Sequence, residues 1–200
     1  MGAERLRVRD AEPLRRGRFV VLFRVVLYVP QAVVIAVWSF VAAPALAVAW
    51  LALLIDGRLP TWLHRFIAAY VRYVGQVTAW FFLLSARYPD PLHTQTHPFV
   101  IELPERPRQP RLVTLFRLVL AIPPLLLATA LRVVLTLAAV PAWFAGLALG
   151  RTTAGLQELG TFCLRYELET LGYTLLLTAR YPRLVPAGPP PAPASDLPAV

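Results

Sequence analysis

The chain has 200 residues, of which 58% are apolar and only 16% are charged, and its formal net charge at pH 7 is +9. A soluble domain has about 45–50% apolar and about 25% charged residues. The composition therefore excludes a disordered chain, a soluble nucleic-acid-binding protein and a disulfide-stapled secreted domain. It predicts a polytopic membrane protein.

An internal repeat organises the chain. Two segments match without a gap at an offset of 93 positions: Phe23-Arg24 aligns with Phe116-Arg117, and LLSARYP at 83–89 aligns with LLTARYP at 176–182. Such self-similarity indicates two copies of one structural unit. The predicted parts are a basic cytoplasmic N-terminus (1–18), a first membrane repeat (19–89), a Pro-rich cytoplasmic linker (90–111), a second membrane repeat (112–183) and a disordered Pro/Ala-rich tail (184–200).

The first repeat opens with 37 residues, 19–55, whose only charge is Arg24. A single helix of this length would be about 55 Å long, whereas the hydrocarbon core of a bilayer is about 30 Å thick. We therefore predict a short interfacial helix over 19–29, a break at Pro30 and a first span over 31–55. Gly and Pro in the turn at 56–60 end that span, and a second span follows over 62–86.

The second repeat follows the same plan, with an interfacial helix over 112–121 and spans over 124–149 and 155–179. The predicted fold is an all-α integral membrane protein with four transmembrane helices. Because two spans return the chain to its starting side, we expect parallel repeats, related by an axis along the membrane normal. Twelve arginines then lie on the side of the termini and linker and three on the side of the turns, which places both termini in the cytoplasm.

Polar residues inside the predicted spans form the candidate site, because a charge near the bilayer centre costs about 2.5–3.5 kcal/mol. Helical spacing groups them into two equivalent stripes, Arg65/Arg72/Gln76 in the second span and Glu158/Arg165/Glu169 in the fourth. Parallel repeats would set Arg65 level with Glu158 and Gln76 level with Glu169. Glu167 points to another side of its helix, where Arg132 of the third span is a candidate partner.

Three interpretations of these stripes are open. They are structural pairs that fix the register of the repeats, or they line a permeation path or an anionic-lipid site around Arg72 and Arg165. In the third interpretation, the second and fourth helices are only partly inserted, with these arginines at the headgroups. At the predicted membrane interfaces, the expected lipid contacts are Arg24, Arg117, Tyr88 and Tyr181.

The repeat unit combines a Pro-broken first helix, a Trp-containing span that ends in Gly-Arg, an arginine in the middle of the second span and a closing Leu-Leu-x-x-Arg-Tyr-Pro. In these features both units resemble the domain-of-unknown-function 4389 family of bacterial membrane proteins. Ala86 and Ala179 stand where that family often has Asp. The resemblance implies a location in the bacterial cell (inner) membrane. It implies little chemistry, because the family carries no established activity.

No motif of nucleophilic, nucleotide-binding or metalloprotease chemistry occurs in the sequence, so we expect no enzyme activity, cofactor or metal. The expected function is a non-enzymatic scaffold or accessory subunit that packs with lipid or a membrane complex. The alternative is a small transporter or channel subunit with a polar path near Arg72 and Arg165. The expected partners are membrane lipids, with anionic headgroups at the cytoplasmic face, and a second copy of the chain or another membrane protein, but not nucleic acid.

Overall fold

The computed structural model describes residues 23–85, 88–91, 109–149 and 154–184, and this part of the chain is all-helical and contains no strand. The predictions for the basic N-terminus, the tail beyond residue 184 and most of the linker lie outside the described residues. The helices are α2 (Arg24–Asp56), α3 (Thr61–Phe81), α4 (Arg111–Leu115), α5 (Arg117–Leu120), α6 (Ile122–Leu149) and α7 (Ala154–Thr174).

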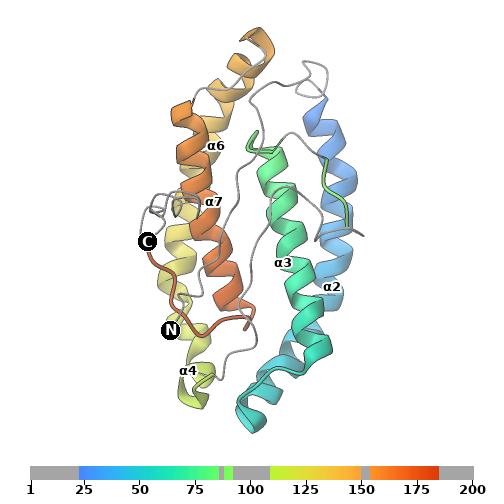
Figure 1. Cartoon of the computed structure of the whole chain (residues 1–200), viewed down its shortest axis with the longest axis vertical. Coiled ribbons are helices and arrows are strands. Elements are labelled where there is room, and N and C mark those ends of the chain that lie inside the picture. The colour runs from blue at the N-terminus through green and yellow to red at the C-terminus, as the bar shows by residue number, and fades with distance from the viewer. Residues whose placement is uncertain (1–22, 86–87, 92–108, 150–153, 185–200) are drawn as a thin grey trace, which may run out of the picture.

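Each repeat is a helical hairpin, α2 with α3 and α6 with α7 (Figure 1). The first hairpin turns at Gly57, which adopts the left-handed conformation (φ 65°) and donates its backbone N–H to the carbonyl of Leu53 over 3.0 Å. Glycine takes this conformation without a steric penalty, so it ends the helix at the position where the sequence predicts a turn. The helix α3 then begins directly after Pro60.

The two hairpins are antiparallel, which corrects the prediction of parallel repeats. The backbone N–H of Gln109, where the second repeat begins, donates to the carbonyl of Gly57 over 3.0 Å. The second repeat therefore starts beside the turn of the first one. At the other end of the molecule, a Cβ added to Gly160 in α7 would lie 2.5 Å from the side chain of Leu84, just beyond α3. The end of α3 thus meets the beginning of α7.

The parallel prediction failed because it assumed that the linker stays at one end of the hairpins. The chain from Pro91 to Gln109 can extend to about 60 Å, whereas the 21-residue helix α3 is only about 32 Å long. Pro89 lies near the start of α2, where its carbonyl accepts a hydrogen bond from Gln31 (3.4 Å). Gln109 lies at the far end of α2, so the linker connects opposite ends of the hairpin.

The predicted break at Pro30 is wrong, because α2 continues through Pro30 and Pro44 as one helix of 33 residues. Side chains on both sides of Pro30 are held by α3. The ring of Tyr28 lies 4.6 Å from that of Phe81, and Tyr73 donates a hydrogen bond to Gln31. These contacts keep the helix continuous despite the hydrogen bond that proline removes.

The second repeat begins with short helical structure before its long helix, as the sequence predicts, but the single helix expected over 112–121 is two pieces. The pieces α4 and α5 are separated at Phe116, and α6 starts at Ile122 with two prolines in its first turn. Proline is accepted there because the first N–H groups of a helix have no partner within it.

The core lies between the hairpins, where α3 packs against α7, and α2 and α6 flank this pair. Large apolar side chains exposed on the described residues belong almost entirely to Phe23, α2 and the α4–α6 segment. Among the described residues, the stretches Arg24–Asp56 and Arg117–Phe144 are long and apolar enough to cross a membrane, whereas α3 and α7 are long enough but less apolar. This supports membrane association for two helices, and four crossings stay a prediction.

Candidate functional site

A buried arginine anchors the first repeat at the end of its hairpin. The side chain of Arg24, at the start of α2, is 3% exposed. Its guanidinium lies 4.7 Å from the ring centroid of Trp80 and donates to the Trp80 carbonyl. Tyr88 closes the arrangement, since its ring meets Trp80 edge-on at 5.3 Å and its hydroxyl donates to the carbonyl of Leu27 (3.3 Å). We call Arg24, Trp80 and Tyr88 the first arginine clasp.

The second repeat builds the same clasp from residues 93 positions further along the chain. Arg117 is 2% exposed, and its guanidinium lies 4.6 Å from the ring centroid of Tyr173. It donates to the carbonyl of Thr178 over 2.8 Å, and Tyr181 meets Tyr173 edge-on at 5.6 Å. A desolvated cation over an aromatic face is worth about 2 kcal/mol or more. We call Arg117, Tyr173 and Tyr181 the second arginine clasp.

The closing motif Leu-Leu-x-x-Arg-Tyr-Pro positions each clasp. Its first leucines, Leu83 and Leu176, adopt the left-handed conformation with φ of 64° and 65°. The following N–H groups reach back five residues, from Leu84 to the carbonyl of Ala79 (2.8 Å) and from Leu177 to that of Gly172 (3.0 Å). This is a Schellman motif with leucine in the place of the usual glycine. A left-handed leucine costs about 1–2 kcal/mol, so the motif must be held by the packing around it.

The structure corrects the role predicted for the two arginines. Arg24 and Arg117 were expected to contact lipid at the membrane interface, but both are buried within the protein. Tyr88 and Tyr181 are each 42% exposed, so lipid contact by them stays a prediction. The missed signal lies in the repeat itself, because Trp80 and Tyr173 are aromatic residues at equivalent positions.

The polar stripes of α3 and α7 are not level in the way that parallel repeats require. Arg65 lies in the second turn of α3, near Gly57, whereas Glu158 lies in the second turn of α7, near the other end of α3. Among the described residues, Arg165 pairs with Glu169 on its own helix, with 3.2 Å between Nε and Oε1. Gln76 is fully buried and Arg72 is half-buried.

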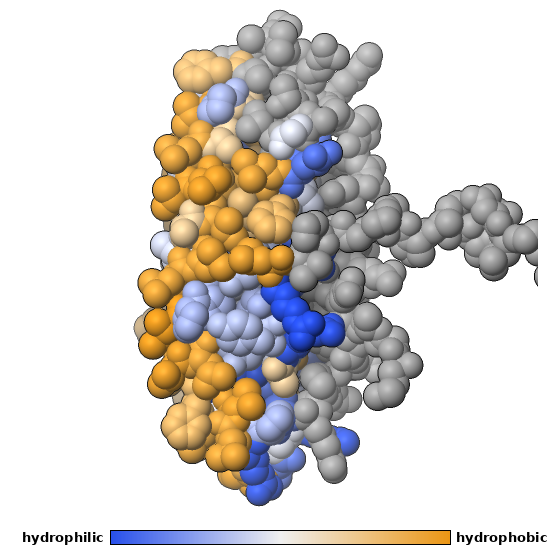
Figure 2. Space-filling view, turned by 90° about the vertical axis from the view of Figure 1, so that its left-hand side faces the viewer, coloured by the Kyte–Doolittle hydropathy of each residue, from blue (hydrophilic) through white to orange (hydrophobic). Residues whose placement is uncertain are grey.

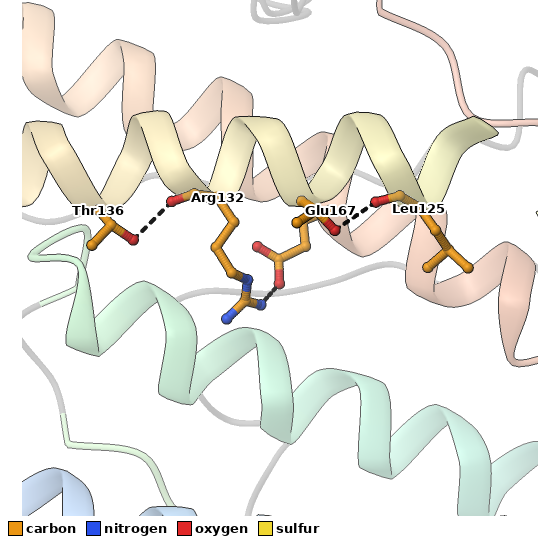
Figure 3. Close-up of polar contacts among 5 residues, drawn as sticks. Leu125, Arg132, Thr136 and Glu167 are labelled. Carbon is orange, nitrogen blue, oxygen red and sulfur yellow. Dashed lines mark hydrogen bonds and ion pairs between the residues drawn. The ribbon is translucent and has the colours of Figure 1, made fainter. Parts of the chain in front are cut away.

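Arg132 and Glu167 form an ion pair between α6 and α7, which agrees with the partner suggested by the sequence (Figure 3). The Arg132 side chain is 49% exposed and that of Glu167 is 15% exposed. Arg132 is ten residues from the start of α6, about 15 Å along the helix axis. In a helix that crosses the membrane, this guanidinium would lie near the bilayer centre, about as far as possible from both headgroup regions.

The equivalent position in the first repeat carries a neutral link that the sequence did not reveal. Ser39 in α2 and Tyr70 in α3 join hydroxyl to hydroxyl over 2.8 Å, and Ser39 also donates to the carbonyl of Ile35 (2.7 Å). The ring of Trp38 stacks on that of Tyr73 at 5.6 Å and meets Tyr70 edge-on at 5.9 Å. An aromatic cluster therefore occupies the middle of the first hairpin.

Over the described residues, these features define an all-helical arrangement of two equivalent hairpins, each closed by a buried arginine. A family model described as Domain of unknown function (DUF4389) matches the chain twice, at residues 18–93 and 111–184. The chain belongs to this family, as the repeated motifs indicate. No curated protein and no solved structure gives a significant match. The described residues also hold no group of three or more His, Cys, Asp or Glu side chains placed to bind a metal ion.

Proposed function

We propose that this protein is a non-enzymatic membrane protein that acts as a scaffold or accessory subunit and contacts lipid through α2 and α6. The observation that carries this proposal is the exposed apolar surface of these helices. Val37 and Phe40 in α2 and Leu126 and Leu137 in α6 all have more than half of their surface exposed. Isolated apolar residues are common on soluble proteins, but large contiguous apolar faces mark a site where lipid or another protein binds.

The polar residues support a structural role rather than a catalytic one. Arg24 and Arg117 are enclosed in the two arginine clasps, and Arg132 is paired with Glu167. Arg165 is paired with Glu169 of its own helix. The contacts of Arg24, Arg117 and Arg132 join different parts of the chain and hold its helices together. Polar contacts between helices stabilise membrane proteins by about 0.6 kcal/mol each on average, which is enough to fix their register.

Localisation in the bacterial cell membrane, cytoplasmic termini, and a second copy or membrane protein as partner stay predictions of the sequence. The expected orientation rests on counting twelve arginines against three, and this count assumed parallel repeats. In the antiparallel arrangement, the turn at 56–60 lies at the same end as Gln109 and the closing motif of the second repeat. The bias therefore gives no orientation for the structure described above.

Alkaline carbonate extraction of cell membranes tests the proposal. We expect the intact chain to stay in the membrane pellet, as an integral protein does, and to float with lipid in a density gradient. Val37→Glu should move part of the protein to the supernatant, because a carboxylate on the lipid face of α2 loses its solvation. Arg58→Glu is the matched control, since Arg58 lies exposed in the turn after α2. Complete release of the unmodified chain by carbonate would refute the proposal.

A further inference from the structure

The helices form two layers of different polarity. In Figure 1 the ribbons of α2 and α6 lie on the far side of α3 and α7. Most of the exposed large apolar side chains lie on α2 and on the α4–α6 segment. Figure 2, which views the molecule from the side of α6 and α7, shows hydrophobic residues gathered along one edge, the side that faces away from the viewer in Figure 1. The layer of α3 and α7 carries both polar stripes, including the exposed Arg65 and Glu158. A protein with one apolar side and one polar side matches a membrane surface rather than the bilayer interior.

We propose that the chain lies along the membrane, with α2 and α6 immersed in the acyl chains of one leaflet and α3 and α7 on its headgroup side. This inference rests on the proposed membrane function and adds how the protein is inserted. A helix with its side chains is about 10–12 Å thick, and one leaflet contributes about 15 Å of hydrocarbon. One layer of helices therefore fits within a single leaflet.

The ends of the linker favour this arrangement over helices that cross the bilayer. Pro89 lies beside Gln31 near the start of α2, and Gln109 lies beside Gly57 at its end. If α2 crossed the bilayer, the polar and Pro-rich segment between them would have to cross it as well. Irregular backbone at membrane depth must be covered by protein or by water. If α2 lies along the membrane surface, Pro89 and Gln109 are both at that surface and no crossing between them is required.

The ion pair of Arg132 with Glu167 also favours helices that lie along one leaflet. In Figure 3 the Arg132 side chain leaves α6 on the side of the α3 ribbon and meets Glu167 of α7 there. For helices that cross the bilayer, this pair, with its half-exposed Arg132, would lie near the centre of the hydrocarbon. For helices that lie along the leaflet, the pair is at the boundary between the two layers, within reach of the headgroups. Arg72 and Arg165 then lie on the polar side as well.

A single-leaflet arrangement has a consequence for the transporter alternative. A permeation path must connect the two sides of the membrane, and here none of the helices crosses it. The inference therefore opposes a path along Arg72 and Arg165 and agrees with the partly inserted second and fourth helices that the sequence left open.

Three exposed positions distinguish the possible insertions, namely Arg58, Glu158 and Leu184. Each is replaced by Cys in a Cys163→Ser background and labelled with a membrane-impermeant maleimide in intact spheroplasts and in inverted vesicles. We expect all three to label from one and the same side, at least tenfold over the other. Antiparallel helices that cross the bilayer would label Arg58→Cys and Leu184→Cys from one side and Glu158→Cys from the other. Parallel crossing repeats would label Arg58→Cys and Glu158→Cys from one side and Leu184→Cys from the other.

Either of the two split patterns overturns the inference while leaving the membrane function intact. Carbonate extraction of the same three variants keeps the two questions apart. Variants that pellet and label from one side support both proposals, whereas variants released by carbonate refute the membrane function itself. Labelling in detergent serves as the control for reactivity, since every site must react there for its protection in membranes to count.

Discussion

The two repeats have the same kind of arginine clasp at the end of the hairpin, but different polar links between the helices in the middle. At the ends, the arginine clasps use equivalent arginines and aromatic residues, and the leucines Leu83 and Leu176 are both left-handed. The carbonyl acceptors differ, because Arg24 donates to Trp80 and Arg117 donates to Thr178. In the middle, the first repeat links its helices through Ser39 and Tyr70, whereas the second uses Arg132 and Glu167 at the level of Ser39. The offset of 93 positions makes this comparison direct, because Ser39 and Arg132 are equivalent.

The difference shows which contacts define the unit. A clasp gathers the start of the first helix, the end of the second helix and the closing motif at a single point, so each part depends on the others. The mid-helix links join only two side chains, and an ion pair can replace a hydroxyl pair without changing the hairpin. The repeated motif of the sequence therefore marks the clasp, while the spans between its elements were free to diverge.

The largest effect is expected from breaking a clasp. Arg24→Leu and Arg117→Leu should each lower the free energy of unfolding by about 3 kcal/mol, through loss of the aromatic contact and of the bond to a carbonyl. Thermal or SDS-induced unfolding followed by circular dichroism in detergent measures this. Arg180→Leu is the control, because Arg180 is exposed. A large loss in only one of the two variants would show that the clasps are not energetically equivalent.

The helical class, the repeat and most helix boundaries could be predicted from composition and self-similarity. The turn after Asp56 follows from Gly57, and the short pieces before α6 follow from the prolines at its start. The continuous helix through Pro30 could not be predicted, because contacts of Tyr28 and Gln31 with α3 decide it. The relative direction of the repeats also escaped, since a long polar linker carries no periodicity that would fix its path.

The candidate site was also only partly predictable, because it depends on contacts between segments that are far apart in the sequence. The sequence offered Arg132 as a candidate partner of Glu167 but did not fix the pair, which the structure forms. The burial of Arg24 and Arg117 could not be predicted. A single arginine in an apolar segment is typical of a membrane interface, and only its aromatic partner indicates that it is buried. The prediction that Arg65 lies level with Glu158, and Gln76 with Glu169, assumed parallel repeats and is wrong because the repeats are antiparallel.

The antiparallel contact between the repeats can be tested at Gly160. A valine there would collide with Leu84, because even a Cβ atom would lie 2.5 Å from its side chain. Overpacking of this kind should destabilise by about 2 kcal/mol, and Leu84→Ala should restore part of the loss in a double-mutant cycle. Gly155→Val in the same helix is the control, since nothing lies within 4 Å of its added Cβ. The equivalent residue of the first repeat is Ile67, so the close approach is particular to α7.

A smaller effect is expected from the ion pair of the second repeat. Glu167→Gln leaves Arg132 without its opposite charge and should lower the free energy of unfolding by about 1 kcal/mol. Glu158→Gln in the same helix is the control, because Glu158 is exposed. Arg132→Ser copies the residue of the first repeat at this position and should recover stability in the Glu167→Gln background. If Glu167→Gln has no effect even at low salt, the pair does not contribute to holding the hairpin.

The smallest effect is expected at the neutral link of the first repeat. Ser39→Ala and Tyr70→Phe each remove one hydroxyl and should cost about 0.6 kcal/mol, the average for polar contacts between membrane helices. Ser39 also bonds to the carbonyl of Ile35, so the single variant overstates the contact and only the double-mutant cycle isolates it. A coupling energy smaller than that of Arg132 with Glu167 would show that the second repeat gained a stronger link. Equal coupling would mean that the attraction between the two charges, less the cost of their partial desolvation, stabilises the hairpin no more than the hydroxyl pair does.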